Sequence, residues 1–97
     1  MDSLDGAIEE ARELPAAYVL KAANGDYLYK GACRDLKERL KDHRSGRSSR
    51  TKNRRPLSLV HSEYCETYSD ALKREKYYKS GFGRTWLKRL LKKQGLM

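Results

Sequence analysis

The stretch AAYVLKAANGDYLYKG, residues 16–31, decides the fold. It consists of two strand-like runs, rich in aromatic and branched side chains, on either side of the pair Asn24-Gly25. Asn-Gly between such runs is the strongest short-range signal for a β-hairpin, because both positions of a two-residue turn need a positive φ angle. We therefore predict a hairpin in which Ala23 lies opposite Asp26.

Counting back from that turn places Leu20 opposite Tyr29 and Tyr18 opposite Gly31. Opposed residues share a face of the sheet, so Tyr18 and Tyr29 are expected as diagonal neighbours, roughly 7–8 Å apart, with open space beside Gly31. Cross-strand packing explains two such phenols. A pocket explains them as well, since a phenol in an electropositive pocket can act on water or on a phosphate oxygen.

The rest of the chain favours helices around one further strand. Apolar periodicity and capping residues predict helices over 3–14, 34–44 and 84–93, a helix capped by Ser69 that runs to about Lys79, a strand over 56–64 and a basic loop over 45–55. The order indicates an α+β fold with a small sheet covered by helices. We expect an acidic N-terminal helical extension over 1–14 and one domain over 15–97. The extension either packs on the core or covers a basic surface.

The net charge of the 97 residues is +9 and is unevenly distributed. Residues 1–13 carry five acidic residues against one arginine, so the remainder is a polycation. Such an excess favours nucleic acid, because phosphates neutralised by Lys or Arg release counterions, although a solvated surface explains the charge too. The cations expected to follow a phosphate backbone are Arg47, Arg50, Lys52, Arg54 and Arg55.

The sequence gives no reason to expect a membrane protein. No apolar run approaches the roughly 20 residues that a spanning helix needs, and the acidic N-terminus lacks the features of a secretion signal. We therefore expect a cytoplasmic protein. Its oligomeric state is not indicated.

Two residues stand at the edge of the apolar stripe of the helix over 34–44. Arg39 and His43 are four positions apart, beside the stripe that contains Leu36 and Leu40. A guanidinium is suited to holding a phosphate, and an imidazole can transfer a proton near neutral pH. An ion pair between Arg39 and Asp35, four residues earlier, is the simpler interpretation of the arginine.

Glu75 lies inside the apolar arc of the next helix, between Tyr68, Leu72 and Tyr78. Burying an ionised carboxylate costs several kcal/mol unless it is paired or binds a metal. An ion pair with a neighbouring cation and a single oxygen ligand for Mg²⁺ both account for it.

Taken in order, Tyr18, Tyr29-Lys30-Gly31, Arg39, His43 and Glu75 resemble the signature of the GIY-YIG nucleases, from about residue 16 to 92. The segments DLKERL (35–40), NRRPL (53–57) and ALKREK (71–76) resemble the compact, single-domain bacterial branch. The chain departs from the pattern at Ala16-Ala17, where the first motif usually begins Gly-Ile, and at Lys30, where the second usually has a residue such as Ile.

This resemblance implies a three-stranded antiparallel sheet flanked by helices and an endonuclease that hydrolyses phosphodiester bonds in DNA, in repair or processing. It implies Mg²⁺ or Mn²⁺ held by Glu75, charge stabilisation by Arg39, proton transfer assisted by His43, two motif tyrosines, Tyr18 and Tyr29, and Gly31 as the motif glycine. The sequence does not separate DNA from RNA. The alternatives are a non-catalytic nucleic-acid-binding module, in which Glu75 closes an ion pair, and a protein-interaction domain.

Overall fold

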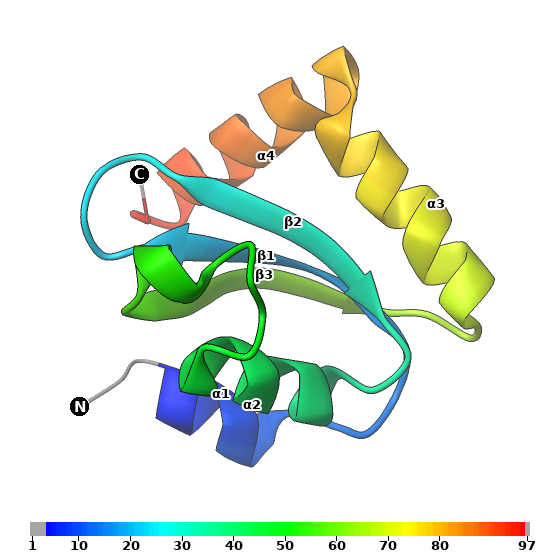
Figure 1. Ribbon diagram of the computed structural model, residues 1–97. Helices are drawn as coiled ribbons and strands as arrows, with labels where there is room; N and C mark the ends of the chain where they lie inside the picture. The colour runs from blue at the N-terminus through cyan, green and yellow to red at the C-terminus, as the bar shows by residue number, and fades with distance from the viewer. Residues whose placement is uncertain (1–3, 97) are drawn as a thin grey trace.

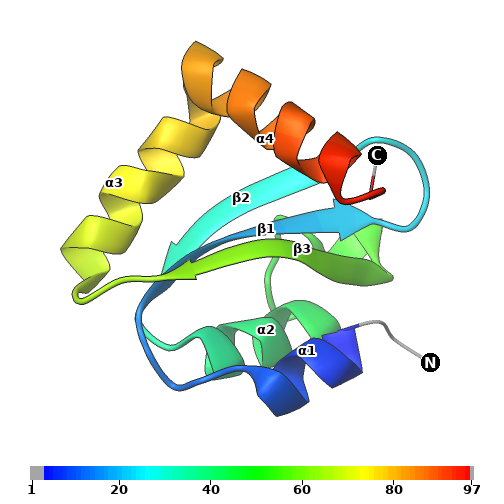
Figure 2. The same ribbon diagram turned by 180° about the vertical axis from the view of Figure 1, so that it is seen from behind.

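The computed structural model describes residues 4–96, and in this range the protein is an α+β fold built on one three-stranded antiparallel sheet in the order β2-β1-β3. This confirms the expected fold class. The strands are β1 (Ala16–Ala22), β2 (Leu28–Cys33) and β3 (Leu57–Tyr64), and a short 3-10 helix, η1 (Lys52–Arg54), precedes β3. Helices α1 (Leu4–Glu10) and α2 (Leu36–Ser45) cover one face of the sheet, and α3 (Tyr68–Lys79) and α4 (Gly81–Lys93) cover the other (Figures 1 and 2).

The hairpin register agrees with the prediction. Tyr18 lies opposite Gly31, and Leu20 lies opposite Tyr29. Because side chains alternate between the two faces of a strand, this register sends both tyrosines to the face covered by α1 and α2.

The turn itself differs from the prediction. Gly25 has a φ of 86°, but within residues 4–96 no residue other than glycine has a positive φ, so Asn24-Gly25 is not the two-residue turn with two positive φ angles. The backbone N–H of Ala23 donates to the carbonyl of Pro56 at 3.0 Å. Ala23 is thus bonded to the segment that leads into β3, and the hairpin opens there instead of closing tightly.

The first helix is shorter than predicted and ends at Glu10 instead of continuing to residue 14. Backbone carbonyls of the following segment accept hydrogen bonds from the first amides of α2. Leu36 N–H donates to the Leu14 carbonyl at 3.1 Å, and Lys37 N–H donates to the Arg12 carbonyl at 3.4 Å. Helical geometry would turn these carbonyls away from α2, whose first amides lack partners inside their own helix. The predicted start at Ser3 lies outside the described residues.

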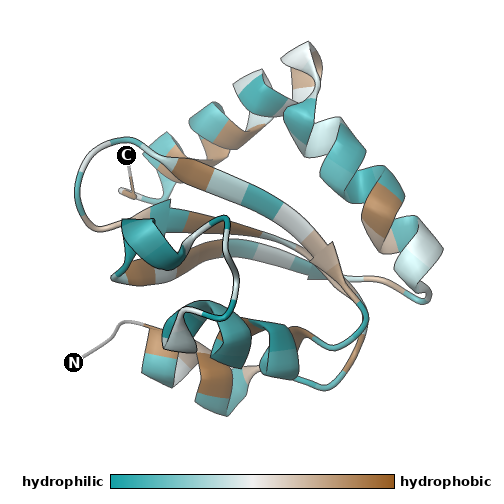
Figure 3. Ribbon diagram, viewed as in Figure 1, coloured by the Kyte–Doolittle hydropathy of each residue, from teal (hydrophilic) through white to brown (hydrophobic). Residues whose placement is uncertain are grey.

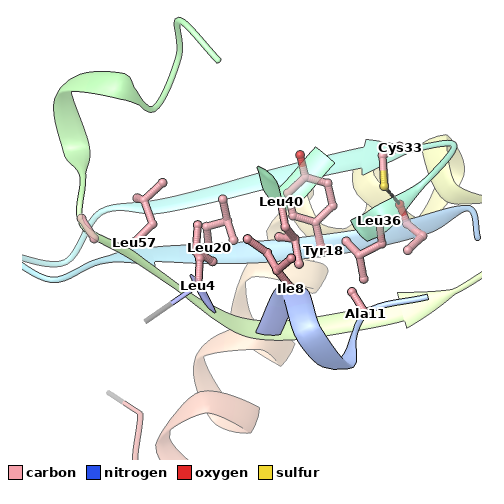
Figure 4. Packing of buried hydrophobic residues seen from close by; sticks show 11 residues of the cluster. Leu4, Ile8, Ala11, Tyr18, Leu20, Cys33, Leu36, Leu40 and Leu57 are labelled. Carbon is pink, nitrogen blue, oxygen red and sulfur yellow. Dashed lines mark hydrogen bonds between the residues drawn. The ribbon is translucent and has the colours of Figure 1, made fainter. Parts of the chain in front are cut away.

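Helix α1 packs on the core, which was the first of its two expected roles. Leu4 and Ile8 are buried in the same cluster as Tyr18, Leu36 and Leu40, as Figure 4 shows. The charged side of α1 is tied to α2 as well, since the Arg44 guanidinium donates to the Asp5 carboxylate at 2.7 Å.

The starts of the other helices differ from the prediction by a few residues. Asp35 caps α2, and Thr67, not Ser69, caps α3 by accepting from the N–H of Asp70 at 3.1 Å. Helix α4 begins at Gly81, three residues before the predicted start. In the described part of the chain, no helix is both long and apolar enough for a membrane span.

A glycine makes the close turn between α3 and α4 possible. A Cβ placed on Gly83 would lie 1.7 Å from the Tyr77 carbonyl oxygen, which no side chain can tolerate. Gly83 lies in the first turn of α4, where its missing side chain lets the start of this helix approach the end of α3.

Candidate active site

Two tyrosines from neighbouring strands form the base of the candidate site. The ring centroids of Tyr18 and Tyr29 are 6.2 Å apart. A Cβ on Gly31 would lie 2.7 Å from the Tyr18 Cζ and Oη atoms and 2.8 Å from Tyr29 Cε2. The space expected beside Gly31 is therefore not open, because both rings lie over the glycine, and any side chain there would displace them.

His43 of α2 joins this pair from the other side. Its Nε2 lies 2.7 Å from the Tyr18 hydroxyl, and its Nδ1 lies 2.7 Å from the Thr51 Oγ1. Its ring centroid is 5.2 Å from that of Tyr29. Tyr18, His43 and Thr51 are each 0% exposed, so a chain of three hydrogen-bonded polar groups is sealed inside the protein.

The three hydrogen-bonded side chains, Tyr18, His43 and Thr51, are neutral near pH 7. Burial, helped by the nearby charge of Arg39, lowers the pKa of His43 to about 4. Burial and the neighbouring Tyr29 raise the pKa of the Tyr18 phenol, so it keeps its proton near neutral pH. A neutral imidazole has one donor and one acceptor nitrogen, so Tyr18 and Thr51 bond to opposite kinds of nitrogen and hold the ring in place.

Arg39 lies between the buried hydrogen-bonded side chains and the protein surface. Its guanidinium interacts electrostatically with the phenols of Tyr18 and Tyr29, and its side chain is 34% exposed. It also lies 3.7 Å from an oxygen of Asp42 and donates to Ser48 Oγ at 3.4 Å. The ion pair expected with Asp35 is not formed, because the Asp35 carboxylate caps α2.

A groove opens beside Arg39. Its volume is about 380 Å³, and it is lined by Ala32, Cys33, Arg34, Asp35, Glu38, Arg39, Asp42 and Tyr68. It thus runs from the start of α2 to the start of α3. Carboxylates and guanidinium groups both face it, and Arg39 is the member of the tyrosine–histidine cluster that lines it.

A model of the GIY-YIG catalytic domain matches residues 15–89. The chain belongs to the GIY-YIG family. This confirms the resemblance inferred from the signature residues and indicates a nuclease-type function with a nucleic-acid substrate.

The chain is also similar to proteins named UPF0213 from Staphylococcus aureus strains Mu3, Mu50 and N315. Each is 44% identical over 59 residues, a stretch that covers 60% of this chain and 71% of the relative. No solved structure matches the chain. These relatives support a compact GIY-YIG protein, and their names state no activity.

The GIY-YIG signature residues do not all meet in the structure. Tyr18, Tyr29, Arg39 and His43 are joined by the contacts described above, whereas Glu75 lies on α3. Its side chain is 22% exposed and forms an ion pair with Lys79, one helical turn further on. The ion-pair interpretation of Glu75 thus holds in this structure.

The five cations predicted to bind nucleic acid are all exposed in this GIY-YIG protein, but they have different surroundings. Arg55 donates to the carbonyls of Lys52 and Arg44, at 3.1 Å in each case. The Arg54 guanidinium lies 4.4 Å from the ring centroid of Tyr27, and Arg47 lies 3.4 Å from an Asp42 oxygen. These three help to order the loop, and Arg50 and Lys52 extend from it.

Sequence reasoning missed Thr51, which the structure places against His43. It had grouped this residue with the charged loop over 45–55. A signal was present in Gly46, whose φ of 84° ends α2 in the left-handed conformation and turns the chain back. Such a cap indicates a reversal of direction, but it does not say which loop residue will reach the helix.

Proposed function

We propose that this GIY-YIG protein is a divalent-metal-dependent endonuclease that hydrolyses phosphodiester bonds in DNA, with repair or processing of DNA as its setting. The observation that carries the proposal is the convergence of Tyr18, Tyr29, Arg39 and His43 on one cluster that opens at Arg39. In this proposal the nuclease domain comprises residues 15–97, and residues 1–14 are an N-terminal extension, of which Leu4 and Ile8 pack on the core.

The burial of these residues divides their roles. Tyr29 and Arg39 are partly exposed, so they are proposed to contact the substrate. The phenol of Tyr29 orients the attacking water, and the Arg39 guanidinium stabilises the charge that develops on the phosphoryl oxygens. Tyr18 and His43 are fully buried and act as positioning residues behind them.

A metal is proposed at Glu75, and the donor set restricts which metal fits. Among residues 4–96, no group of three or more His, Cys, Asp or Glu is arranged to hold an ion. A single carboxylate suits Mg²⁺ or Mn²⁺, which keep most of their waters, and Glu75 would hold the ion in place of its ion pair with Lys79. When bound, the ion would supply Lewis-acid stabilisation of the phosphoryl and leaving oxygens.

The position of Glu75 on its helix supports this assignment. Tyr68 lines the groove beside Arg39, and Glu75 follows it by seven residues, which places both on the same side of α3. The two residues are about 10 Å apart along the helix axis. A strand of nucleic acid that enters the groove at Arg39 and follows α3 therefore passes Glu75.

The basic loop is proposed to hold the nucleic acid next to this site. Arg50 and Lys52 contact phosphates directly, while Arg47, Arg54 and Arg55 contribute charge from the ordered part of the loop. Contacts of this kind carry no base specificity, so they accept DNA and RNA alike.

The test compares Glu75→Gln with Glu9→Gln, the same chemical change at an exposed position of α1. Purified protein is incubated with supercoiled plasmid, single-stranded DNA and RNA, with Mg²⁺, Mn²⁺ or EDTA. We expect metal-dependent nicking by the unchanged protein and by Glu9→Gln, and a loss of at least about a hundredfold in rate by Glu75→Gln with DNA affinity retained.

Two results would contradict the proposal. Equal cutting by Glu75→Gln would remove the metal assignment. Tight DNA binding by the unchanged protein without cleavage in any metal would favour the second candidate, a non-catalytic nucleic-acid-binding module, which the Glu75–Lys79 ion pair supports.

A further inference from the structure

A second group of cations lies on the side of the sheet opposite the basic loop. Lys30 of β2 has Arg84, Lys79 and Lys88 close enough for their charges to lower its pKa, in addition to the effect of its own partial burial. Lys30, Lys88 and Lys92 line a groove of about 540 Å³ between β2 and α4, together with Leu28 and Asp26. We call Lys30, Lys79, Arg84, Lys88 and Lys92 the α4 surface.

Among the described residues, Lys79 is the one cation of this surface that forms an ion pair, with Glu75. The sequence has no Asp or Glu after Glu75, so α4 carries only positive charge, and Asp26 is the one carboxylate that lines the groove. Like charges gathered in this way destabilise the folded protein. Solubility alone does not require them to meet in one groove, whereas a bound polyanion offsets their repulsion.

An exposed aromatic ring lies near the start of α4. Phe82, in the first turn of α4 between Lys79 and Arg84, is 87% exposed. The apolar side of α4 is used elsewhere, since Leu87 and Leu91 are buried against the sheet, and Figure 3 shows hydrophobic and hydrophilic residues alternating along this helix. Phe82 therefore stands outside the core, at the corner where α3 meets α4 (Figure 1).

We propose that the α4 surface binds an unpaired strand of nucleic acid, with its lysines along the phosphates and Phe82 stacked on a base. Proteins that bind single strands combine a basic groove with exposed aromatic rings. Every unpaired base can stack on such a ring, whereas a base inside a duplex is already stacked between its neighbours. The binding does not depend on the cleavage reaction. It gives the protein a contact that the basic loop and the groove at Arg39 do not provide.

The experiment measures binding of fluorescein-labelled oligodeoxythymidine, about 20 nucleotides long, by fluorescence anisotropy in EDTA, at several salt concentrations. Lys88→Glu is compared with Lys73→Glu, the same charge reversal at an exposed position of α3. Phe82→Ala is compared with Phe82→Tyr, which keeps an aromatic ring. All three positions of change are exposed, and circular dichroism verifies that each of the four variants is folded.

We expect Lys88→Glu to weaken binding about tenfold more than Lys73→Glu and to reduce the salt slope by about 0.7 or more, the contribution of one phosphate contact on a single strand. Phe82→Ala should weaken binding roughly tenfold with an unchanged salt slope, and Phe82→Tyr should restore it. Because EDTA prevents cleavage, these results stand whether or not the nuclease proposal holds.

Several outcomes would overturn the inference. One is an equal loss of affinity in Lys73→Glu and Lys88→Glu, which would show that the affinity depends on the net charge of the protein and not on the α4 surface. Another is preferred binding of hairpin duplex DNA without any effect of Phe82→Ala. A third is binding of phosphatidylserine vesicles or of polyglutamate in place of the oligonucleotide, which would assign the surface to a membrane or to an acidic protein.

Discussion

Each face of the sheet places a histidine beside a tyrosine, but the surroundings of the two histidines differ. On the face of α2, His43 is fully buried between the hydroxyls of Tyr18 and Thr51. On the face of α3 and α4, His61 lies 2.8 Å from a Glu63 oxygen, and Arg74 donates twice to the same carboxylate, at 2.7 and 3.1 Å.

The difference shows which face is built for stability. The Arg74 guanidinium lies 4.6 Å from the ring centroid of Tyr77 and 4.9 Å from that of Trp86. Its charge therefore interacts both with the Glu63 carboxylate and with aromatic rings. Around His43 the partners are neutral, and the one nearby cation, Arg39, turns toward the groove. Arg39 has one longer ion pair, at 3.7 Å to Asp42, so its guanidinium is held less firmly within the protein than that of Arg74 and is better placed to bind a ligand.

Removing the tyrosine hydroxyl on each face gives the largest expected contrast. Tyr18→Phe leaves the Nε2 of His43 without its partner and lets the ring shift, so we expect cutting to slow by up to about a hundredfold. Tyr78→Phe on the other face should have little effect, since the buried Tyr78 hydroxyl lacks a well-formed hydrogen bond in the described structure, although Glu63 and Arg74 lie close to it.

Single-turnover rates and urea unfolding of both variants are the measurements for this contrast. A rate loss in Tyr18→Phe that tracks its fraction unfolded would reduce Tyr18 to a structural residue. Equal rates in the two variants would remove the distinction between the faces.

Lowering the pH should destabilise the protein through His43. Between its ordinary pKa of 6.5 and its folded pKa of about 4, the unfolded chain binds a proton that the folded chain does not, so stability is lost as pH falls. From about pH 7.5 to pH 5 the loss attributable to His43 should be about 2 kcal/mol. The free energy of unfolding is measured across this range for the unchanged protein and for His43→Gln, and parallel curves would contradict the prediction.

Thr51→Val tests the hydrogen bond between Thr51 and His43. It keeps the shape of the side chain but leaves Nδ1 of His43 unpaired, which should cost about 1.5 kcal/mol of stability and slow cutting about tenfold. Thr51→Ser keeps the hydroxyl and should preserve both. Nitrogen-15 chemical shifts of the imidazole report its tautomer, and an unchanged tautomer together with an unchanged rate in Thr51→Val would leave Thr51 without a positioning role.

The smallest effect is expected on the opposite face. Glu63→Gln removes the charge that holds Arg74, but this pair is about one third exposed, so the loss of stability should stay below about 1 kcal/mol and shrink further in high salt. Cutting should not change. Thermal unfolding and the nicking assay measure the two quantities, and a large loss of activity would mean that this face takes part in the reaction.

Much of the fold could be predicted because strands and helices produce patterns among residues that are close in the sequence. Counting back from Asn24-Gly25 gave the register that brings Tyr18 and Tyr29 together, and this register is confirmed although the predicted turn type was wrong, because the loop is still centred on the same two residues. Helical spacing placed Arg39 and His43 on one edge of α2. Helix ends were less accurate, since Arg12 and Leu14 leave helical geometry only to satisfy amides of a different helix.

The sequence by itself determined which residue types carry the family signature and which side of each strand or helix they occupy. Only the tertiary structure decided that Thr51 forms a hydrogen bond with His43 and that Lys30 lies near the cations of α4. Periodicity acts over a few residues and fixes direction relative to one element. Contacts between a loop and a helix, or between a strand and a distant helix, depend on how the elements pack, which no local pattern encodes.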